Sequence, residues 1–123
     1  MASSRALTVW LPILAWAAVI FAFSSIPSLS SGLGVWDTVL RKGAHMLEYA
    51  LLWFLWWRAL GYGSKLPAVA IALAYAATDE FHQHFVEGRV GSPVDWLIDA
   101  TGVALAIAAV NWRARKRAAV LEA

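Results

Sequence analysis

An uninterrupted apolar stretch near the start of the chain constrains the fold most strongly. Residues 6–23 contain no charged side chain, and Ser24, Ser25 and Pro27 then end the stretch. Its length is close to the roughly 20 residues that an α-helix needs to cross the apolar core of a bilayer. The whole chain is similarly apolar, because 61% of its 123 residues are hydrophobic and only 15% are charged. Soluble domains are about half apolar and about a quarter charged. The sequence therefore predicts an integral membrane protein.

Three further apolar segments follow the first one, and glycines and prolines mark the connections between them. We expect four transmembrane helices, at about residues 6–23, 43–60, 66–85 and 94–112. These spans fill most of the chain, so we expect one domain over residues 1–123 with an all-α fold, arranged as an antiparallel bundle. A cleaved signal peptide is the alternative for the first segment, but the segment is longer than the usual apolar region of about 7–15 residues.

The distribution of Lys and Arg predicts how the chain is oriented. One side of the membrane would carry Arg5, Arg58, Lys65, Arg113, Arg115, Lys116 and Arg117. The other side would carry only Arg41, Lys42 and Arg89. By the positive-inside rule, we expect both termini to be cytoplasmic. The basic residues flank spans and do not form one basic face, so we expect no nucleic-acid partner.

Polar side chains gather in one half of each of the last three spans. Neighbouring spans run in opposite directions, so the start of the second, the end of the third and the start of the fourth meet at the outer side. Spacings of three, four and seven residues place members of each set on one helix face. Charged residues at membrane depth usually face inward and mark a functional site. The residues concerned are Lys42, His45, Glu48, Tyr49, Asp79, Glu80, Gln83, Asp95 and Asp99.

The predicted cluster carries more negative than positive charge. Its five carboxylates exceed its two fixed cations, Lys42 and Arg89, by three charges. Ion pairing alone cannot neutralise this excess. Three explanations stay open, because crowded acids cannot all remain ionised in a low dielectric: protonated carboxylates, a protonated His45, or a bound divalent cation. The chain contains no cysteine, which excludes a thiolate nucleophile or ligand.

The polar residues form spaced motifs. The second span contains Lys42-x-x-His45-x-x-x-Tyr49, and the third contains Asp79-Glu80-x-x-Gln83, followed by Arg89. The fourth contains Asp95-x-x-x-Asp99-x-x-Gly102. With Ser24-Ser25-x-Pro27 after the first span, these motifs resemble the VanZ-like family over about residues 21–106. The resemblance implies a small four-helix bacterial membrane protein. It also implies a link to resistance against the glycopeptide teicoplanin, with which the family's namesake is associated, but it implies no reaction.

The leading functional hypothesis is an enzyme that acts on a lipid or a lipid-linked cell-wall component entering from the outer leaflet. The catalytic candidates are His45, Asp79 and Glu80, as acid, base or metal ligand. Lys42 and Arg89 would bind a phosphate or carboxylate, with Tyr49 and Gln83 as hydrogen-bond donors. Glu48, Asp95 and Asp99 would support the site. If a divalent cation is bound, its oxygen ligands would come from Asp79, Glu80, Asp95 and Asp99.

Two alternatives stay open. The protein could bind an anionic lipid head group or a glycopeptide without changing it, or the cluster could be a structural network that holds the helices together. His82 and His84 are expected to be solvated at the interface. Residues 29–41 are expected to form a connector or a short amphipathic helix on the outer surface. Gly102 and Ala106 form a pair of small residues that would let a neighbouring helix approach closely. Oligomeric state is not predicted.

Overall fold

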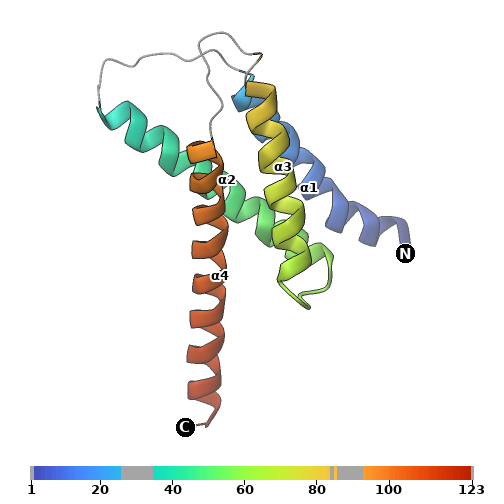
Figure 1. Cartoon of the computed structure of the whole chain (residues 1–123). Helices are drawn as coiled ribbons and strands as arrows, with labels where there is room; N and C mark the ends of the chain where they lie inside the picture. Colours follow the sequence, from blue (N-terminus) through green and yellow to red (C-terminus); the bar gives the residue numbers. More distant parts are fainter. Residues whose placement is uncertain (1, 26–34, 84, 86–92, 123) are drawn as a thin grey trace.

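The chain folds into four α-helices that run alternately toward opposite ends of the molecule. The computed structural model describes residues 2–25, 35–83, 85 and 93–122. The helices are α1 (Ala2–Ser24), α2 (Val35–Ala59), α3 (Leu66–Gln83) and α4 (Pro93–Glu122). In Figure 1, α1 and α3 run upward while α2 and α4 run downward, so the α2–α3 turn and the end of α4 lie on the lower side. The predicted all-α fold is confirmed.

Two helix boundaries differ from those expected. Of the predicted connector or surface helix at residues 29–41, residues 29–34 lie outside the described residues. Residues 35–41 form the first turns of α2, which continues to Ala59. The fourth helix does not end near residue 112 but extends to Glu122. Residues 103–122 contain no glycine or proline and several alanines and arginines, which favour helix over coil. The basic residues after Trp112 therefore lie on a helix.

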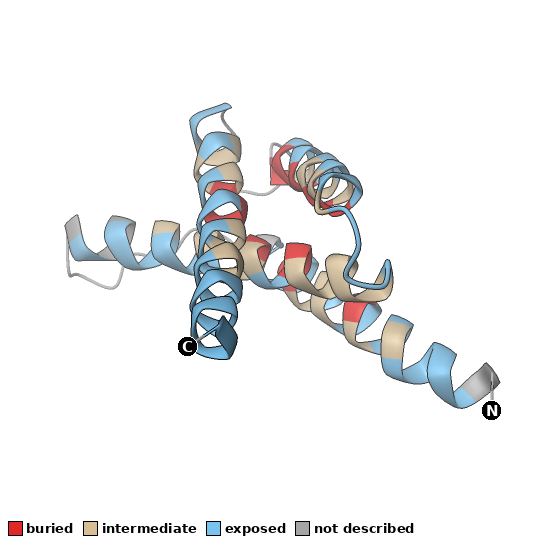
Figure 2. Cartoon of the chain, turned by 90° about the horizontal axis from the view of Figure 1, so that it is seen from below, coloured by how far each residue is buried: buried red, intermediate tan, exposed pale blue. Residues whose placement is uncertain are grey.

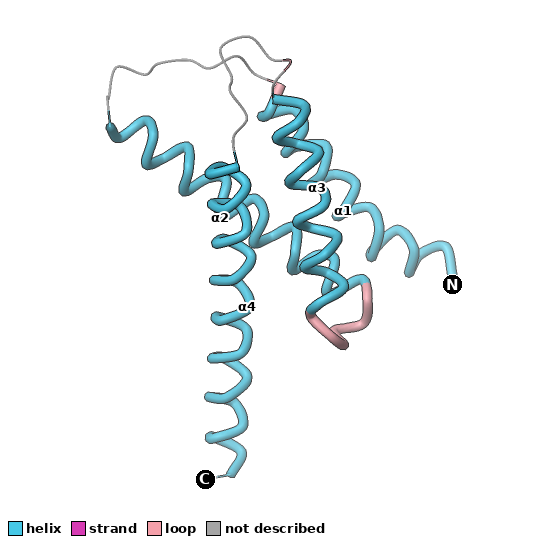
Figure 3. Tube along the Cα trace, viewed as in Figure 1, coloured by secondary structure: helices cyan, strands magenta, loops and turns pink. Residues whose placement is uncertain are grey.

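The turn between α2 and α3 is short and well defined, as Figure 3 shows. Gly61 and Tyr62 both adopt positive φ angles, of 85° and 59°. Tyr62 is an unusual residue for this conformation, and two contacts hold it there. Its backbone N–H donates to the Trp57 carbonyl at 3.0 Å, and its ring packs edge-on against the Trp57 ring at 5.0 Å.

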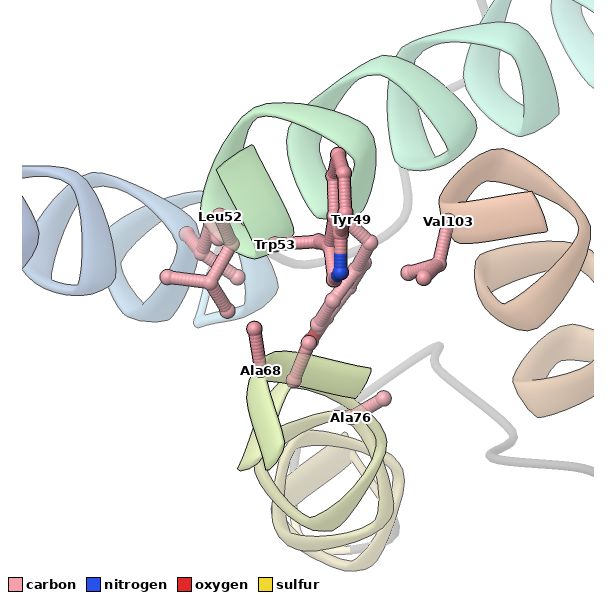
Figure 4. Close-up of a cluster of buried hydrophobic side chains, with 8 residues drawn as sticks. Tyr49, Leu52, Trp53, Ala68, Ala76 and Val103 are labelled. Carbon is pink, nitrogen blue, oxygen red and sulfur yellow. The ribbon is translucent and has the colours of Figure 1, made fainter. Parts of the chain in front are cut away.

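Helix α2 lies at the centre of the structure, and small side chains on α3 let it pack closely. This helix contacts α1, α3 and α4, and it buries Tyr49, Leu52 and Trp53 completely or almost so. On α3, a row of alanines four residues apart, Ala68, Ala72 and Ala76, is fully buried. Figure 4 shows Tyr49, Leu52 and Trp53 beside Ala68, Ala76 and Val103. Because alanine has no bulk beyond Cβ, the large side chains of α2 can pack onto the backbone of α3.

Hydrogen bonds from side chains to backbone carbonyls tie the helices together. The Trp16 indole of α1 donates to the Glu48 carbonyl of α2 at 2.9 Å. The Tyr75 hydroxyl of α3 donates to the Ala17 carbonyl of α1 at 2.7 Å, and the Trp96 indole of α4 donates to the Leu73 carbonyl of α3 at 3.1 Å. Buried Trp and Tyr usually need such partners for their polar ends. In Figure 1, α2 crosses α4 obliquely, so the four axes are less parallel than in a regular bundle.

The outer surface of the helices is largely apolar. Leu47, Leu66 and Phe81 are 70%, 75% and 67% exposed, and Figure 2 shows buried residues mainly where the helices cross. Soluble monomers rarely leave so much contiguous apolar surface open. Among the described residues, two segments are long and apolar enough to cross a membrane, Ser4–Phe23 and Pro93–Glu122. These features are consistent with a membrane protein. The four-span arrangement with cytoplasmic termini stays a prediction, since the polar residues of α2 and α3 lower their hydropathy.

Candidate functional site

Helices α2 and α4 approach each other closely at Gly102. A Cβ atom added at this buried glycine would lie 2.7 Å from the Met46 Cα and would overlap the Met46 carbonyl oxygen. The expected close contact at Gly102 is thereby confirmed. The side chains next to this contact are forced together, because His45 precedes Met46 and Asp99 lies one turn before Gly102.

His45 and Asp99 form the most deeply placed ion pair of the site. Nδ1 of His45 lies 3.4 Å from Oδ1 of Asp99, and the Asp99 side chain is fully buried. The same nitrogen lies 3.8 Å from Oε2 of Glu48, one turn further along α2. The imidazole is therefore held between two carboxylates, one from its own helix and one from α4.

A second ion pair lies nearer the surface of the same two helices. The Nζ atom of Lys42 is 3.5 Å from Oδ1 of Asp95, and the two side chains are 42% and 35% exposed. Lys42 precedes His45 by three residues and Asp95 precedes Asp99 by four, so both pairs follow one α2–α4 seam. The seam passes from a partly solvated Lys–Asp pair to a buried His–Asp pair.

Asp79 forms the centre of a hydrogen-bond network between α2 and α3. The Tyr49 hydroxyl donates to Oδ2 of Asp79 at 3.0 Å, and the Gln83 amide donates to the same oxygen at 3.5 Å. Asp79, Glu80 and Gln83 are all buried. They continue the face that carries Ala68, Ala72 and Ala76, so the buried stripe of α3 changes from small apolar to acidic in its last two turns. The predicted four-residue spacing of Asp79 and Gln83 on one face is confirmed.

Several buried polar atoms of this cluster have no hydrogen-bond partner within the described part of the chain. They are Nδ1 of His45, Oδ1 of Asp79 and both carboxylate oxygens of Asp99. The His45–Asp99 contact has the distance of an ion pair without hydrogen-bond geometry. Buried polar atoms are nearly always satisfied in folded proteins. Because Nδ1 of His45 and Oδ1 of Asp99 face each other across the ion pair, Oδ2 of Asp99 and Oδ1 of Asp79 are the two atoms that call for a water, an ion or a ligand group.

The structure brings most of the predicted site residues into two neighbouring groups. His45, Glu48 and Asp99 meet between α2 and α4, and Tyr49, Asp79 and Gln83 meet between α2 and α3. Tyr49 and Gln83 direct their donors at Asp79, and their assignment to substrate binding stays a prediction. Arg89 lies outside the described residues. Lys42 pairs with Asp95, as one of the structural alternatives expects.

The described residues do not form a preformed site for the predicted divalent cation. Within residues 2–25, 35–83, 85 and 93–122, no three His, Asp or Glu side chains are grouped so that they could hold one metal ion. Asp79, Glu80, Asp95 and Asp99 stay a predicted ligand set.

The structure places His82 differently from the sequence pattern, against α1 and outside the His45–Asp99 pair. It was expected to be solvated, but its ring stacks on Phe21 of α1 with the ring centres 4.5 Å apart. Its Nδ1 is buried and has no hydrogen-bond partner among the described residues. The three-residue step from Asp79 to His82 was the available signal, since it places both residues near one face of α3. His84 lies outside the described residues.

Comparison with known proteins supports the resemblance carried by these motifs. A family model described as VanZ/LLP1 matches residues 9–114. No curated protein and no solved structure matches the chain. The matched region contains every described residue of the polar cluster and covers most of the chain. The chain therefore belongs to the VanZ/LLP1 family.

Proposed function

We propose that this protein is a membrane-embedded hydrolase or transferase of the bacterial inner membrane. Its substrate would be an envelope lipid or a lipid-linked cell-wall component that reaches the polar cluster from the outer leaflet. The observation that carries the proposal is the buried His45–Asp99 pair, whose facing atoms lie 3.4 Å apart and lack hydrogen-bond partners among the described residues. A group for acid–base chemistry is thus held in a polar cluster between helices, beside buried oxygens of Asp99 and Asp79 that a ligand can satisfy.

In this proposal, Asp99 is a positioning residue and His45 transfers the proton. In the neutral form of His45, a carboxylate at Nδ1 favours the tautomer with the proton on that nitrogen, which leaves Nε2 to accept a proton. Nε2 removes a proton from a water or alcohol as its oxygen forms a bond to the electrophilic centre of the substrate. His45 then returns that proton to the leaving group as the old bond breaks. Such proton transfer contributes about 10²- to 10⁴-fold to a rate.

The remaining residues of the cluster have supporting roles. Lys42 is partly exposed at the outer end of the seam, where its charge suits a phosphate or carboxylate. Arg89 follows α3 in sequence and is proposed to bind the same group. Tyr49 and Gln83 fix Asp79 through one oxygen. Oδ1 of Asp79 is then available to accept a hydrogen bond from a substrate hydroxyl or a water. Glu80 is the next residue in the sequence.

A divalent cation is a variant of this proposal. Oxygen-rich sites suit Mg²⁺ or Ca²⁺, and the four proposed ligands are Asp79, Glu80, Asp95 and Asp99. Elemental analysis of protein purified without a His tag tests it directly. Less than about 0.1 equivalent of any divalent metal would argue against a tight site, whereas about one equivalent that falls on Asp79→Asn substitution would support it.

A non-catalytic binder is the second candidate function. The partly exposed Lys42 beside the buried acids favours it, because a fixed cation at the edge of a polar cluster can hold an anionic lipid head group. A glycopeptide is the other proposed ligand, because the family's namesake is associated with resistance to the glycopeptide teicoplanin. In this case the ligand pairs with the buried polar atoms that lack hydrogen-bond partners, and it dissociates without a chemical change.

Comparative lipid mass spectrometry separates the candidates. Cells would express the wild type, His45→Gln or His82→Gln at matched membrane levels. His82→Gln is the matched control, because it makes the same substitution in the same polar region outside the His45–Asp99 pair. A lipid species gained or lost with the wild type and His82→Gln, but not with His45→Gln, supports the enzyme. Three identical lipid profiles would contradict it and leave binding as the leading function.

A further inference from the structure

A basic groove lies at the end of the molecule opposite the polar cluster. It has a volume of about 640 Å³ and is formed by the start of α1, the end of α2 and the turn that follows. Its two charged residues are Arg5 and Arg58, one from each helix. Ala6, Ala59 and Gly61 also line it, and their small size leaves room between the two guanidinium groups.

The two arginines have no acidic partner in the described part of the chain. The ion pairs found there involve Lys42 and His45, and no carboxylate lies within 4.0 Å of Arg5 or Arg58. Two arginine side chains that line one groove, without an acidic partner among the described residues, can bind an anion. Arginine recognises phosphate well, because its planar group donates two parallel hydrogen bonds.

The rest of the groove suits the apolar part of a lipid. Val9 and Trp10 line it beside Arg5, and Trp10 packs edge-on against Trp56 of α2 with ring centres 5.7 Å apart. On α1, Leu7 and Leu14 lie one helical turn on either side of Trp10 and are 60% and 66% exposed. Trp side chains commonly lie at the level of lipid head groups. A phosphate held by the arginines would thus have its acyl chains beside an apolar helix.

We propose that Arg5, Arg58 and Trp10 form a binding site for the phosphate group of an anionic phospholipid in the inner leaflet. Basic pockets between transmembrane helices on the cytoplasmic side are suited to anionic head groups. The site is separate from the polar cluster, and it does not depend on whether that cluster is catalytic. Free phosphate shares the same chemistry, but it would not use Val9, Trp10 or the leucines of α1.

The test is native mass spectrometry of the detergent-solubilised protein titrated with one ligand at a time. The ligands are phosphatidylglycerol, phosphatidylcholine and inorganic phosphate. The variants are Arg5→Gln/Arg58→Gln and, as the matched control, Arg115→Gln/Arg117→Gln. The control removes the same charge on the same side of the molecule, from residues of α4 that do not line the groove. We expect the wild type and the control to bind phosphatidylglycerol more tightly than phosphatidylcholine, and the groove variant to bind it about tenfold more weakly.

Three results would overturn the proposal. Equal weakening by both double variants would show a general effect of net charge. Equal binding of phosphatidylglycerol and phosphatidylcholine by the wild type would show that the arginines do not select an anion. Tight binding of inorganic phosphate that displaces phosphatidylglycerol would make free phosphate the ligand. If Arg5→Gln/Arg58→Gln fails to fold, Arg5→Lys/Arg58→Lys replaces it, and unchanged affinity of that variant would exclude the paired guanidinium contact.

Discussion

Gly102→Ala tests whether the α2–α4 contact sets the geometry of the site. The added Cβ would lie 2.7 Å from the Met46 Cα, whereas carbon atoms normally approach to about 3.5–4.0 Å. Helices α2 and α4 must therefore separate by about 1 Å. The neighbouring atom belongs to the backbone and cannot rotate away, so we place the cost at about 3 kcal/mol, the upper end for overpacking. Alanine favours a helix by about 1 kcal/mol over glycine, which leaves a net loss of about 2 kcal/mol.

Gly43→Ala is the matched control for this experiment. Gly43 also lies inside a helix, but a Cβ at this position would meet nothing within 4 Å. It should therefore show the helix-forming gain alone, about 1 kcal/mol of added stability. The assay is equilibrium unfolding in detergent, followed by the fluorescence of the eight tryptophans. If Gly102→Ala is as stable as Gly43→Ala, the close contact and the positioning of His45 against Asp99 that follows from it are both refuted.

Three further predictions follow from the contacts. Tyr49→Phe removes the shorter of the two hydrogen bonds to Asp79 Oδ2 and should lower the free energy of unfolding by about 1–3 kcal/mol; an unchanged value would contradict this bond. Lys42→Met breaks a pair whose side chains are 42% and 35% exposed, so its stability should stay within about 1 kcal/mol of the wild type, and a larger loss would favour a structural network. The chain has no cysteine, so in intact cells an impermeant maleimide should label Ser25→Cys but not Ser64→Cys; the reverse pattern would invert the proposed orientation.

The sequence predicted the helices and the close contact at Gly102 well. The predicted spans at residues 6–23 and 66–85 lie almost entirely within α1 and α3. They were predictable because the length of an apolar stretch and the glycines and prolines beside it are local signals in the sequence. Gly102 was recognisable because its spacing from Asp95 and Asp99 puts a small residue on the polar face. The extent of a helix and the face on which a residue lies depend on neighbours within that helix, so both can be predicted from the sequence.

The pairing inside the cluster was not predictable from the sequence. Helical spacing gives the face and the depth of Asp95 and Asp99, but both then qualify as partners for a cation. The oblique crossing of α2 and α4 decides that Asp95 meets Lys42 and Asp99 meets His45. In the same way, the stacking of His82 on Phe21 depends on how α1 lies against α3. Such contacts are set by packing between helices that are distant in sequence.

Turnover by purified protein in liposomes tests the central claim most directly. The liposomes would be made from lipid extract of the host bacterium, with products followed by mass spectrometry. Asp99→Asn keeps the size of the side chain but removes the charge beside His45, while Thr101→Ser changes an exposed residue whose hydroxyl only contacts its own helix. The account predicts product formation by the wild type and by Thr101→Ser, and a rate about 10²- to 10⁴-fold lower for Asp99→Asn. Product formation by Asp99→Asn at the wild-type rate would contradict it.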